Sequence, residues 1–241
     1  MDSIRQQCEK LYLESFEDDI EFTNVLFENC FETNCYYLTE DERVVSMLFA
    51  LDVFIGSNKG KYIYAVATNP EYRGKGYMRK LFCDVEDILG GEYSFLCLRP
   101  MNEGLFDFYA RLGFKEKFFK KQIALKGEKV VCKPILVNNA NDVRRIRKAL
   151  CNEKFVEYGS EFYKLLTSYC EILTDSLENP TYLIIRERLS GKIKEFLGDT
   201  ENLPVIFYGE ASTCNGGERY AVYKSLGYNF SDKAYLGLAM D

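Results

Sequence analysis

The 241-residue sequence predicts an α+β fold, because stretches with helical spacing of apolar residues alternate with short apolar runs typical of buried strands. The clearest run covers residues 62–67. It is followed by a glycine-containing loop and by apolar positions three and four residues apart through residue 89. A second apolar run at 93–98 precedes another helical stretch at 105–112. Similar patterns after residue 133 predict a second, smaller α/β unit.

The first half of the chain is expected to read helix, helix, three strands, loop, helix, strand, helix, strand. Residues 3–14 carry apolar positions at helical spacing, and Ser15 or Asp18 can cap a second helix that runs through 25–27. The other elements expected are strands 35–38, 44–54 and 62–67, a helix over 78–89, a strand at 93–98, a helix at 105–112 and a strand within 118–125.

A polar and basic stretch at 126–133 is typical of a linker, so the expected domains are 1–126 and 133–241. The second domain again mixes helices and strands. It is expected to contain a short strand at 135–137, a helix capped at Asn141 or Asp142, a longer helix through 162–173 that Asn179-Pro180 stops, and strands at 182–187, 192–197 and 203–209.

Composition argues against several classes of protein. The net charge of -6 and the pI near 5.1 argue against non-specific nucleic-acid binding, which needs a basic surface. An acidic surface suits a cationic substrate such as an amine, although solubility explains it equally well. No apolar run is long enough to span a bilayer and the N-terminus lacks the pattern of a signal peptide, so no membrane partner is expected.

The cysteine and histidine content excludes further reaction mechanisms. The nine cysteines are scattered, odd in number and without a C-x-x-C pair, which fits reduced, mostly buried thiols in the cytoplasm. The chain contains no histidine, so the commonest general base, the usual zinc ligand and nucleophiles activated by histidine are all missing. A metal-dependent or hydrolytic mechanism is therefore not expected, and no metal site is assigned.

The loop Arg73-Gly74-Lys75-Gly76 is suited to binding an anion. The first N–H groups of a helix have no partner inside it and carry the positive end of its dipole. Two glycines let the backbone approach a ligand closely, and Arg73 and Lys75 add positive charge, so a phosphate or pyrophosphate is the expected guest. The spacing is neither that of a P-loop nor G-x-G-x-x-G. An ordinary strand-to-helix turn is the alternative.

Two motifs resemble those of the GNAT superfamily of N-acetyltransferases. The family's acetyl-CoA loop has the pattern Arg/Gln-x-x-Gly-x-Gly/Ala, which Arg73 and Gly76 match, while Met78 stands where Gly or Ala is usual. This departure changes a side chain and not a backbone donor, so pyrophosphate binding is expected to survive it. The segment 108–114, Phe-Tyr-Ala-Arg-Leu-Gly-Phe, is similar to the family's later F-Y-x-x-x-G-F signature.

The resemblance implies a mixed central sheet flanked by helices over about the first half of the chain. It also implies that acetyl-CoA is the cosubstrate, and that an acetyl group moves to a primary amine of a small molecule or peptide by direct attack in a ternary complex. The alternatives are a non-catalytic acyl-CoA-binding or interaction protein and a nucleotide-binding regulator.

The resemblance also assigns roles to single residues. Backbone N–H groups near Val66 and Thr68 would polarise the thioester carbonyl, although Thr68 alternatively only ends its strand. Tyr109, with an ordinary pKa of about 10, would protonate the departing sulfur as general acid. By itself Tyr109 is more simply a core aromatic residue, and only the pairing of the two motifs favours the catalytic role. The expected acetyl-CoA contacts are Val66, Ala67, Thr68, Arg73, Gly74, Lys75, Gly76, Tyr77 and Met78.

Residues 221–239 repeat the layout of 108–124, including a Leu-Gly-aromatic triplet. This echo predicts a second, degenerate GNAT-like unit of the tandem-domain type, although such a triplet after a helix also occurs by chance. Only residues 198–202 lie between two of the expected strands, which leaves no room for a phosphate-binding loop and its helix. The second unit is therefore expected to be non-catalytic.

The sequence identifies neither the general base, nor the acceptor, nor an oligomeric state. Without histidine the base would be a carboxylate, directly or through water, or bulk solvent. Asp52, the acidic helix start at 17–21 and Asp241 are candidates. The acidic helix start is also a candidate for receiving the amine, but a solvated helix start favoured by the helix dipole explains it more simply.

Overall fold

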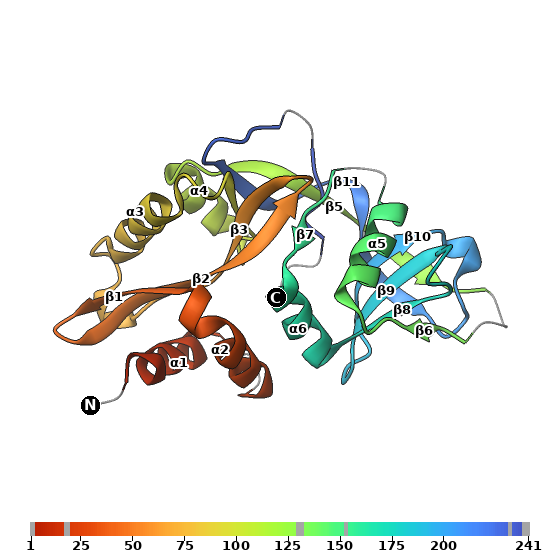
Figure 1. Cartoon of the computed structure of the whole chain (residues 1–241), viewed down its shortest axis with the longest axis horizontal. Helices are drawn as coiled ribbons and strands as arrows, with labels where there is room; N and C mark the ends of the chain where they lie inside the picture. Colours follow the sequence, from red (N-terminus) through yellow and green to blue (C-terminus); the bar gives the residue numbers. More distant parts are fainter. Residues whose placement is uncertain (1–2, 17–19, 129–132, 152–153, 231–232, 238–241) are drawn as a thin grey trace. The chain divides into compact units, whose positions relative to one another are not determined.

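The computed structural model describes residues 3–16, 20–128, 133–151, 154–230 and 233–237 (Figure 1). The chain divides into two compact units, and each is described by itself. The first unit comprises Met1–Lys115 and Val222–Phe230, and the second comprises Glu116–Ala221 and Ser231–Asp241. Residues 116–126 thus lie in the second unit, whereas the sequence analysis assigns them to the first domain.

The first unit follows the expected order of elements. Its helices and strands are α1 (Ile4–Ser15), α2 (Ile20–Asn34), β1 (Cys35–Glu40), β2 (Arg43–Ile55), β3 (Asn58–Thr68), the short 3-10 helix η1 (Pro70–Tyr72), α3 (Tyr77–Leu89), β4 (Phe95–Leu98) and α4 (Glu103–Arg111).

The sheet of the first unit is mixed, which confirms the predicted fold class. Strands β1, β2 and β3 are antiparallel neighbours, whereas β3 and β4 run parallel. The next neighbour of β4 is formed by residues 222–225. The strand expected within 118–125 is present as β5 (Lys115–Lys126), but it pairs with β11 (Tyr208–Ser225) rather than with β4.

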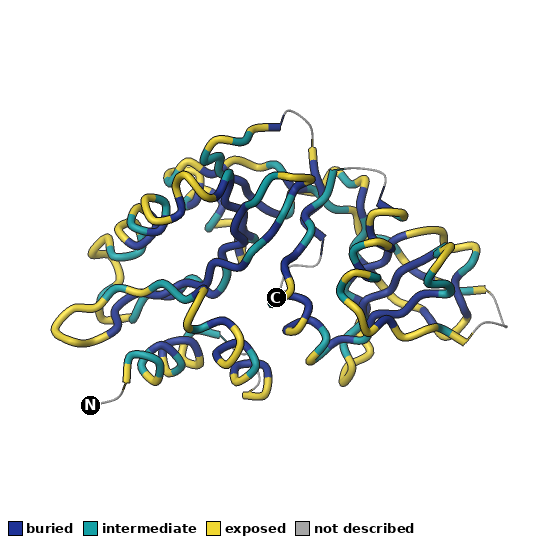
Figure 2. The backbone as a smooth tube through the Cα atoms, viewed as in Figure 1, coloured by how far each residue is buried: buried dark blue, intermediate teal, exposed yellow. Residues whose placement is uncertain are grey.

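Helices cover both faces of this sheet. On one face, Phe27 of α2 packs edge-on against Phe49 of β2, with ring centroids 5.3 Å apart. On the other face, Leu48, Ala50 and Ile63 form one buried cluster with Leu81 and other apolar residues of α3. In Figure 1 the helices α1 and α2 lie on one side of β1 and β2, and α3 and α4 on the other. Figure 2 shows that the strands between these helices are largely buried.

Gly60 is required where β3 and β4 meet. It lies opposite Phe95 in the parallel pair, and the Phe95 ring covers it so closely that a Cβ on residue 60 would lie 2.4 Å from ring carbons. The ring is fully buried and stacks on Tyr223 at a centroid distance of 5.4 Å. A side chain at residue 60 would therefore displace an aromatic ring that has no free space to enter.

We expect Gly60→Ala to lower the free energy of unfolding by about 1–3 kcal/mol, the usual cost of overpacking a core. Gly104→Ala in α4 is the matched control, since its nearest neighbour lies 3.5 Å away, at ordinary contact distance. Urea unfolding followed by circular dichroism measures both. Equal stability of the two variants would contradict the tight fit at residue 60.

The second unit contains a run of paired strands together with helices α5 and α6. Within it β10 pairs with β11 in parallel at a single position, Glu195 with Ser212, and the pairs β10/β9, β9/β8 and β8/β6 are antiparallel. The elements are β5 (Lys115–Lys126), β6 (Ile135–Leu136), α5 (Ala140–Leu150), β7 (Glu157–Tyr158), α6 (Ser160–Tyr169), β8 (Cys170–Thr174), β9 (Tyr182–Glu187), β10 (Ile193–Gly198), the 3-10 helix η2 (Thr200–Asn202) and β11.

The expected helix through 162–173 is too long. Helix α6 ends at Tyr169, and residues 170–174 form β8, because this segment pairs along its whole length with β9. Long-range pairing here overrides the local helical spacing. The strand expected at 203–209 is also wrong, since β11 begins only at Tyr208. Asn139, rather than Asn141 or Asp142, caps α5.

The sequence echo between 108–124 and 221–239 does not correspond to matching structure at its start. The first copy begins in helix α4, whereas residues 222–225 of the second copy are strand residues paired with β4. The partner strand, and not the Leu-Gly-aromatic triplet, decides the conformation of the second copy.

A buried ion pair joins α5 to β10 in the second unit. Arg147 Nη2 lies 3.1 Å from Glu195 Oε1, and the two side chains are 2% and 1% exposed. Arg147 also donates to the carbonyl of Val156 at 3.3 Å. Removing one partner would leave the other charge buried without compensation, which costs far more than the pair contributes.

Glu195→Ala is therefore expected to destabilise the protein by about 3–5 kcal/mol. The double variant Arg147→Met with Glu195→Leu removes both charges and should lose much less stability. Chemical denaturation of the two proteins and the wild type measures the difference. A double variant as unstable as the single one would show that packing, rather than the unpaired charge, dominates.

Candidate functional site

The backbone of β3 departs from a regular strand at Ala65. This residue has φ 52°, although it is not a glycine, and the pairing with β2 shifts there: Ala67 lies opposite Met47 but Tyr64 lies opposite Phe49. One extra residue on β3 is the signature of a β-bulge, which re-aims side chains and is frequent next to active sites. A positive φ at a residue with a Cβ is a strained conformation of the kind that collects at functional sites.

Just before this bulge β3 loses its neighbour β4. The parallel pairing runs from Gly60 to Tyr62, whereas β3 continues to Thr68. Asn69 donates its N–H to the carbonyl of Val45 in β2. Because successive N–H groups of an extended strand point in opposite directions, those of Thr68 and Val66 point to the edge that faces away from β2.

The same alternation points the backbone N–H and carbonyl groups of Ala67 toward β2. Its carbonyl accepts a hydrogen bond from Ser46 Oγ at 3.1 Å, and Ser46 Oγ lies 3.1 Å from Thr68 Oγ1. Of the three expected contacts on β3, Val66 and Thr68 are thus placed to offer backbone donors at the open edge, and Ala67 is not.

A tight loop then leads from β3 into α3. Asn69 caps η1 by accepting from the Glu71 N–H, and Arg73 Nε donates to the Thr68 carbonyl at 3.1 Å. Gly74 and Gly76 have φ 76° and 86°, in the left-handed region, and no atom lies within 4 Å of the position where a Cβ would stand on either. The loop therefore has open space beside both glycines.

The first turn of α3 leaves its backbone donors without a side-chain cap. Gly76 occupies the N-cap position, where it cannot supply a capping oxygen. Arg73 and Lys75 flank it, and Lys75 Nζ lies 4.6 Å from the centre of the Tyr72 ring. Uncapped N–H groups, a helix dipole and two cations at one point make a site for an anion such as a phosphate or diphosphate.

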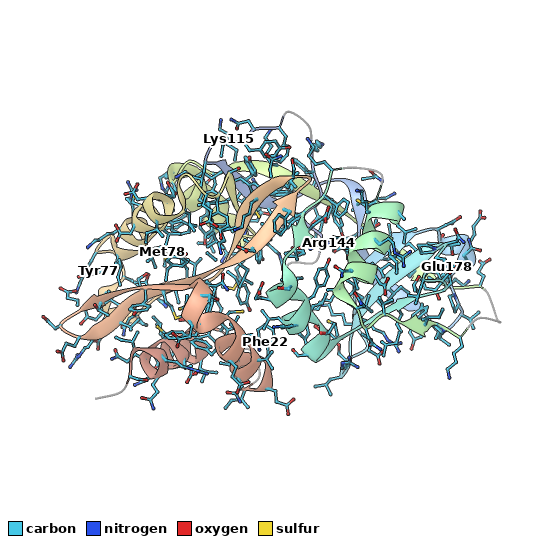
Figure 3. The ribbon with its side chains drawn as sticks, in the orientation of Figure 1. Phe22, Tyr77, Met78, Lys115, Arg144 and Glu178 are labelled. Atoms are coloured by element: carbon cyan, nitrogen blue, oxygen red, sulfur yellow. The ribbon has the colours of Figure 1, made fainter. Side chains whose placement is uncertain are left out.

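Tyr77 and Met78 begin α3 and have different surroundings (Figure 3). The Tyr77 hydroxyl donates to Glu40, the last residue of β1, and this bond raises the pKa of Tyr77 to about 12. Met78 turns toward the sheet, where its Sδ lies 4.0 Å from Ser46 Oγ. Sequence reasoning missed Glu40, because no local signal links the end of a strand to a helix 37 residues later.

Tyr109 lies in the core between α3, α4 and the sheet. Its side chain is 5% exposed, and its ring packs edge-on against Phe82 and Phe114 at centroid distances of 6.0 and 5.8 Å. Burial raises the pKa of Tyr109 above its ordinary value. The hydroxyl consequently keeps its proton over the ordinary pH range, as a general acid must, and the ring also serves the core.

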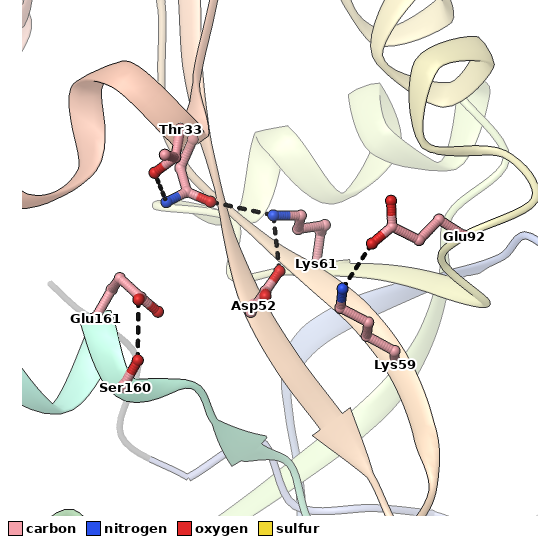
Figure 4. Close-up of polar contacts among 8 residues, drawn as sticks. Thr33, Asp52, Lys59, Lys61, Glu92, Ser160 and Glu161 are labelled. Atoms are coloured by element: carbon pink, nitrogen blue, oxygen red, sulfur yellow. Dashed lines mark hydrogen bonds and ion pairs between the residues drawn. The ribbon is translucent and has the colours of Figure 1, made fainter.

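Asp52, a candidate base, is held in an ion pair (Figure 4). Its Oδ1 lies 2.7 Å from Nζ of Lys61, which is 4% exposed and also donates to Asn34 Oδ1 at 3.1 Å. The carboxylate is thus engaged by an ammonium group rather than open toward a substrate. Two of the other candidates, residues 17–19 of the acidic helix start and Asp241, lie outside the described residues.

Part of this chain matches a known protein family. Residues 2–114 match the model of the acetyltransferase (GNAT) family. No match is found among curated proteins. The first unit thus coincides with the matched residues, apart from its returning segment.

Several solved structures share the fold. A probable N-acyltransferase of unknown function from Enterococcus faecalis V583 is 16% identical, with a TM-score of 0.66 over 92% of this chain and 70% of that one. A GCN5-related N-acetyltransferase from Anabaena variabilis is 14% identical, with a TM-score of 0.65 over 92% and 69%. Eis1 from Mycobacterium abscessus is 7% identical, with a TM-score of 0.63 over 94% and 73%. The likeness extends through both units.

The described part of the chain lacks two other features. None of its helices is long and apolar enough to cross a membrane. No three of its cysteine, aspartate and glutamate side chains gather as ligands for a metal ion.

The anion site can be tested with inorganic pyrophosphate. We expect Gly76→Val to weaken binding about ten-fold or more, because a β-branched residue disfavours the left-handed backbone and turns the first N–H groups of α3 away. Backbone NMR shifts of residues 74–78 during titration measure the affinity.

Gly56→Val is the matched control for this test. Gly56 also has a positive φ, of 60°, and open space around it, but lies in the turn between β2 and β3. Gly56→Val should introduce the same backbone strain and leave pyrophosphate binding unchanged. Equal losses of binding in the two variants would point to general destabilisation rather than to an anion site.

Proposed function

Residues 2–114 match the model of the acetyltransferase (GNAT) family, and on this premise we propose that the protein moves an acetyl group from acetyl-CoA to a primary amine of a small molecule or peptide. The transfer is a direct attack in a ternary complex. The observation that carries the proposal is a continuous run of three features: a bulged strand end with no partner on the edge away from β2, an open glycine loop and an uncapped helix start.

Acetyl-CoA fits this run by its chemistry. Its diphosphate would lie at the loop, where the N–H groups from Arg73 to Met78 and the charges of Arg73 and Lys75 can hold it. The open space beside Gly74 and Gly76 lets phosphate oxygens reach the backbone. The side chain of Met78 turns toward the sheet, so it leaves the backbone donors of the first turn available.

The thioester end would lie along the open edge of β3. The cosubstrate supplies an acetyl group activated by its bond to sulfur. The N–H groups of Val66 and Thr68 point to this edge and would hold the carbonyl oxygen, where a preorganised donor contributes about 3 kcal/mol to catalysis. The bulge at Ala65 fixes their direction before the substrate arrives, which is what makes such donors effective.

Proton transfer completes the proposal. The amine nitrogen forms a bond to the acetyl carbon, the carbon–sulfur bond breaks, and the departing sulfur takes the proton of the Tyr109 hydroxyl. The amine releases its own proton to solvent, and Tyr109 recovers one from solvent. The raised pKa of Tyr109 keeps the hydroxyl protonated between turnovers.

We also propose that the second unit is a degenerate GNAT-like domain without catalysis of its own. Its parallel strands β10 and β11 touch at one position, and β10 is followed by η2 rather than by a glycine loop and a long helix. The whole-chain likeness to N-acetyltransferase structures supports this assignment.

Replacing Tyr109 with Phe tests the catalytic step. We expect kcat to fall ten-fold or more, at the low end of general-acid effects, with acetyl-CoA affinity unchanged. Because the pKa of Tyr109 is raised above about 10, its hydroxyl keeps its proton up to about pH 10. Deprotonation of Tyr109 should therefore not lower the wild-type kcat below that pH. Steady-state assays with an amine panel and calorimetry with CoA measure these quantities.

Tyr93→Phe is the control, since it removes the same atom from another tyrosine of the same buried cluster. Its kcat should equal that of the wild type. Unchanged turnover in Tyr109→Phe would remove the acid role. Heat of CoA binding without turnover of any amine would instead support a non-catalytic acyl-CoA-binding protein.

A further inference from the structure

A pair of tyrosine hydroxyls lies beside the bulge, on the face of the sheet opposite Tyr109. Tyr64 Oη of β3 and Tyr12 Oη of α1 are 3.0 Å apart. Tyr12 is fully buried, whereas Tyr64 is half-buried. Tyr64 directly precedes Ala65, the residue with positive φ, and still pairs with Phe49 of β2 in regular register.

Different side chains of β3 point to the two faces of the sheet. Ile63 belongs to the cluster formed with α3 and α4, which also contains Tyr109. Side chains alternate along a strand, and the bond to Tyr12 shows that Tyr64 points to the opposite face, toward α1. Figure 1 shows these helices on the two sides of β2 and β3.

We propose that Tyr64 positions the acceptor amine, with Tyr12 acting through it; the inference rests on the proposed acetyl transfer. An acetyl group held at the N–H groups of Val66 and Thr68 lies between the two faces of the sheet. Tyr109 serves the departing sulfur from the α3/α4 face, and the nucleophile reaches the carbonyl from the α1/α2 face, where Tyr64 lies two residues before Val66.

The chemistry of a tyrosine hydroxyl suits this role. A phenol oxygen has one donor proton and two acceptor lone pairs, so it can take part in up to three hydrogen bonds at once. An N–H of the amine donates to Tyr64 Oη, which directs the nitrogen lone pair toward the acetyl carbon. The hydroxyl of Tyr12 holds Tyr64 Oη in place and fixes the orientation of the ring.

The surrounding rings indicate the class of acceptor. Tyr12 packs against Phe16 and Phe27 at centroid distances of 5.0 and 5.7 Å. Faces of aromatic rings attract ammonium groups. An aromatic environment of this kind therefore suits an unhindered primary amine.

The test compares Tyr64→Phe, Tyr12→Phe and Tyr62→Phe in the full chain. The amines are cadaverine, phenethylamine and a tripeptide with a free α-amino group. We expect Tyr64→Phe to raise KM for the amine about five- to ten-fold, the range of one hydrogen bond, with KM for acetyl-CoA unchanged. Tyr12→Phe keeps the oxygen of Tyr64 and should have a smaller effect in the same direction.

Tyr62→Phe is the control on the same strand and the same face, and its amine KM should not change. Thermal unfolding distinguishes a positioning role of the two hydroxyls from a purely structural one. In the structural case Tyr64→Phe and Tyr12→Phe would have equally lowered Tm values, and both would keep the wild-type KM for the amine. That result, with turnover intact, would overturn the positioning role and leave the proposed acetyl transfer standing. Wild-type protein that turns over none of the amines would overturn both.

Discussion

The site depends on one constraint, the separation of β3 from β4. Up to Tyr62 the two strands share hydrogen bonds, and beyond it β3 continues alone with a bulge at Ala65. A regular pairing to the end of β3 would have consumed the N–H groups of Val66 and Thr68. Before the bulge, regular alternation along β3 points Tyr64 toward α1 and Ile63 into the cluster with α3. The exposed backbone donors of Val66 and Thr68 are thus a consequence of one interruption in the β3–β4 pairing.

Local patterns were enough to predict the elements around the site. The strand at 62–67, the loop at 73–76 and the helix that follows were predicted because each is encoded by neighbouring residues. The bulge was not, since Ala65 is an ordinary residue for a strand and its positive φ is imposed by the pairing with β2. The partner of β4 was also missed: residues 222–225 resemble a helix end in sequence and become a strand only through contact with β4.

The positions of the charged side chains limit which groups can act on the substrate. Asp52 forms an ion pair with Lys61, to which Asn34 also bonds, so this carboxylate stabilises the pairing of β2 with β3. Tyr109 is neutral near pH 7 and burial raises its pKa further, and the loop cations Arg73 and Lys75 lie at the start of α3. In the described part of the first unit, the groups assigned to the reacting end are therefore backbone amides and phenols. Such groups orient and polarise without titrating near neutral pH.

The returning segment that completes the first sheet has a consequence for synthesis on the ribosome. Residues 222–225 are translated only after the whole of 116–221, which belongs to the second unit. At about 5–20 residues per second, the outer edge of β4 waits roughly 6–25 seconds for its partner strand. During this interval the nascent chain exposes an unpaired strand edge, the feature that chaperones shield and that promotes aggregation. The two units are consequently linked in folding order as well as in sequence.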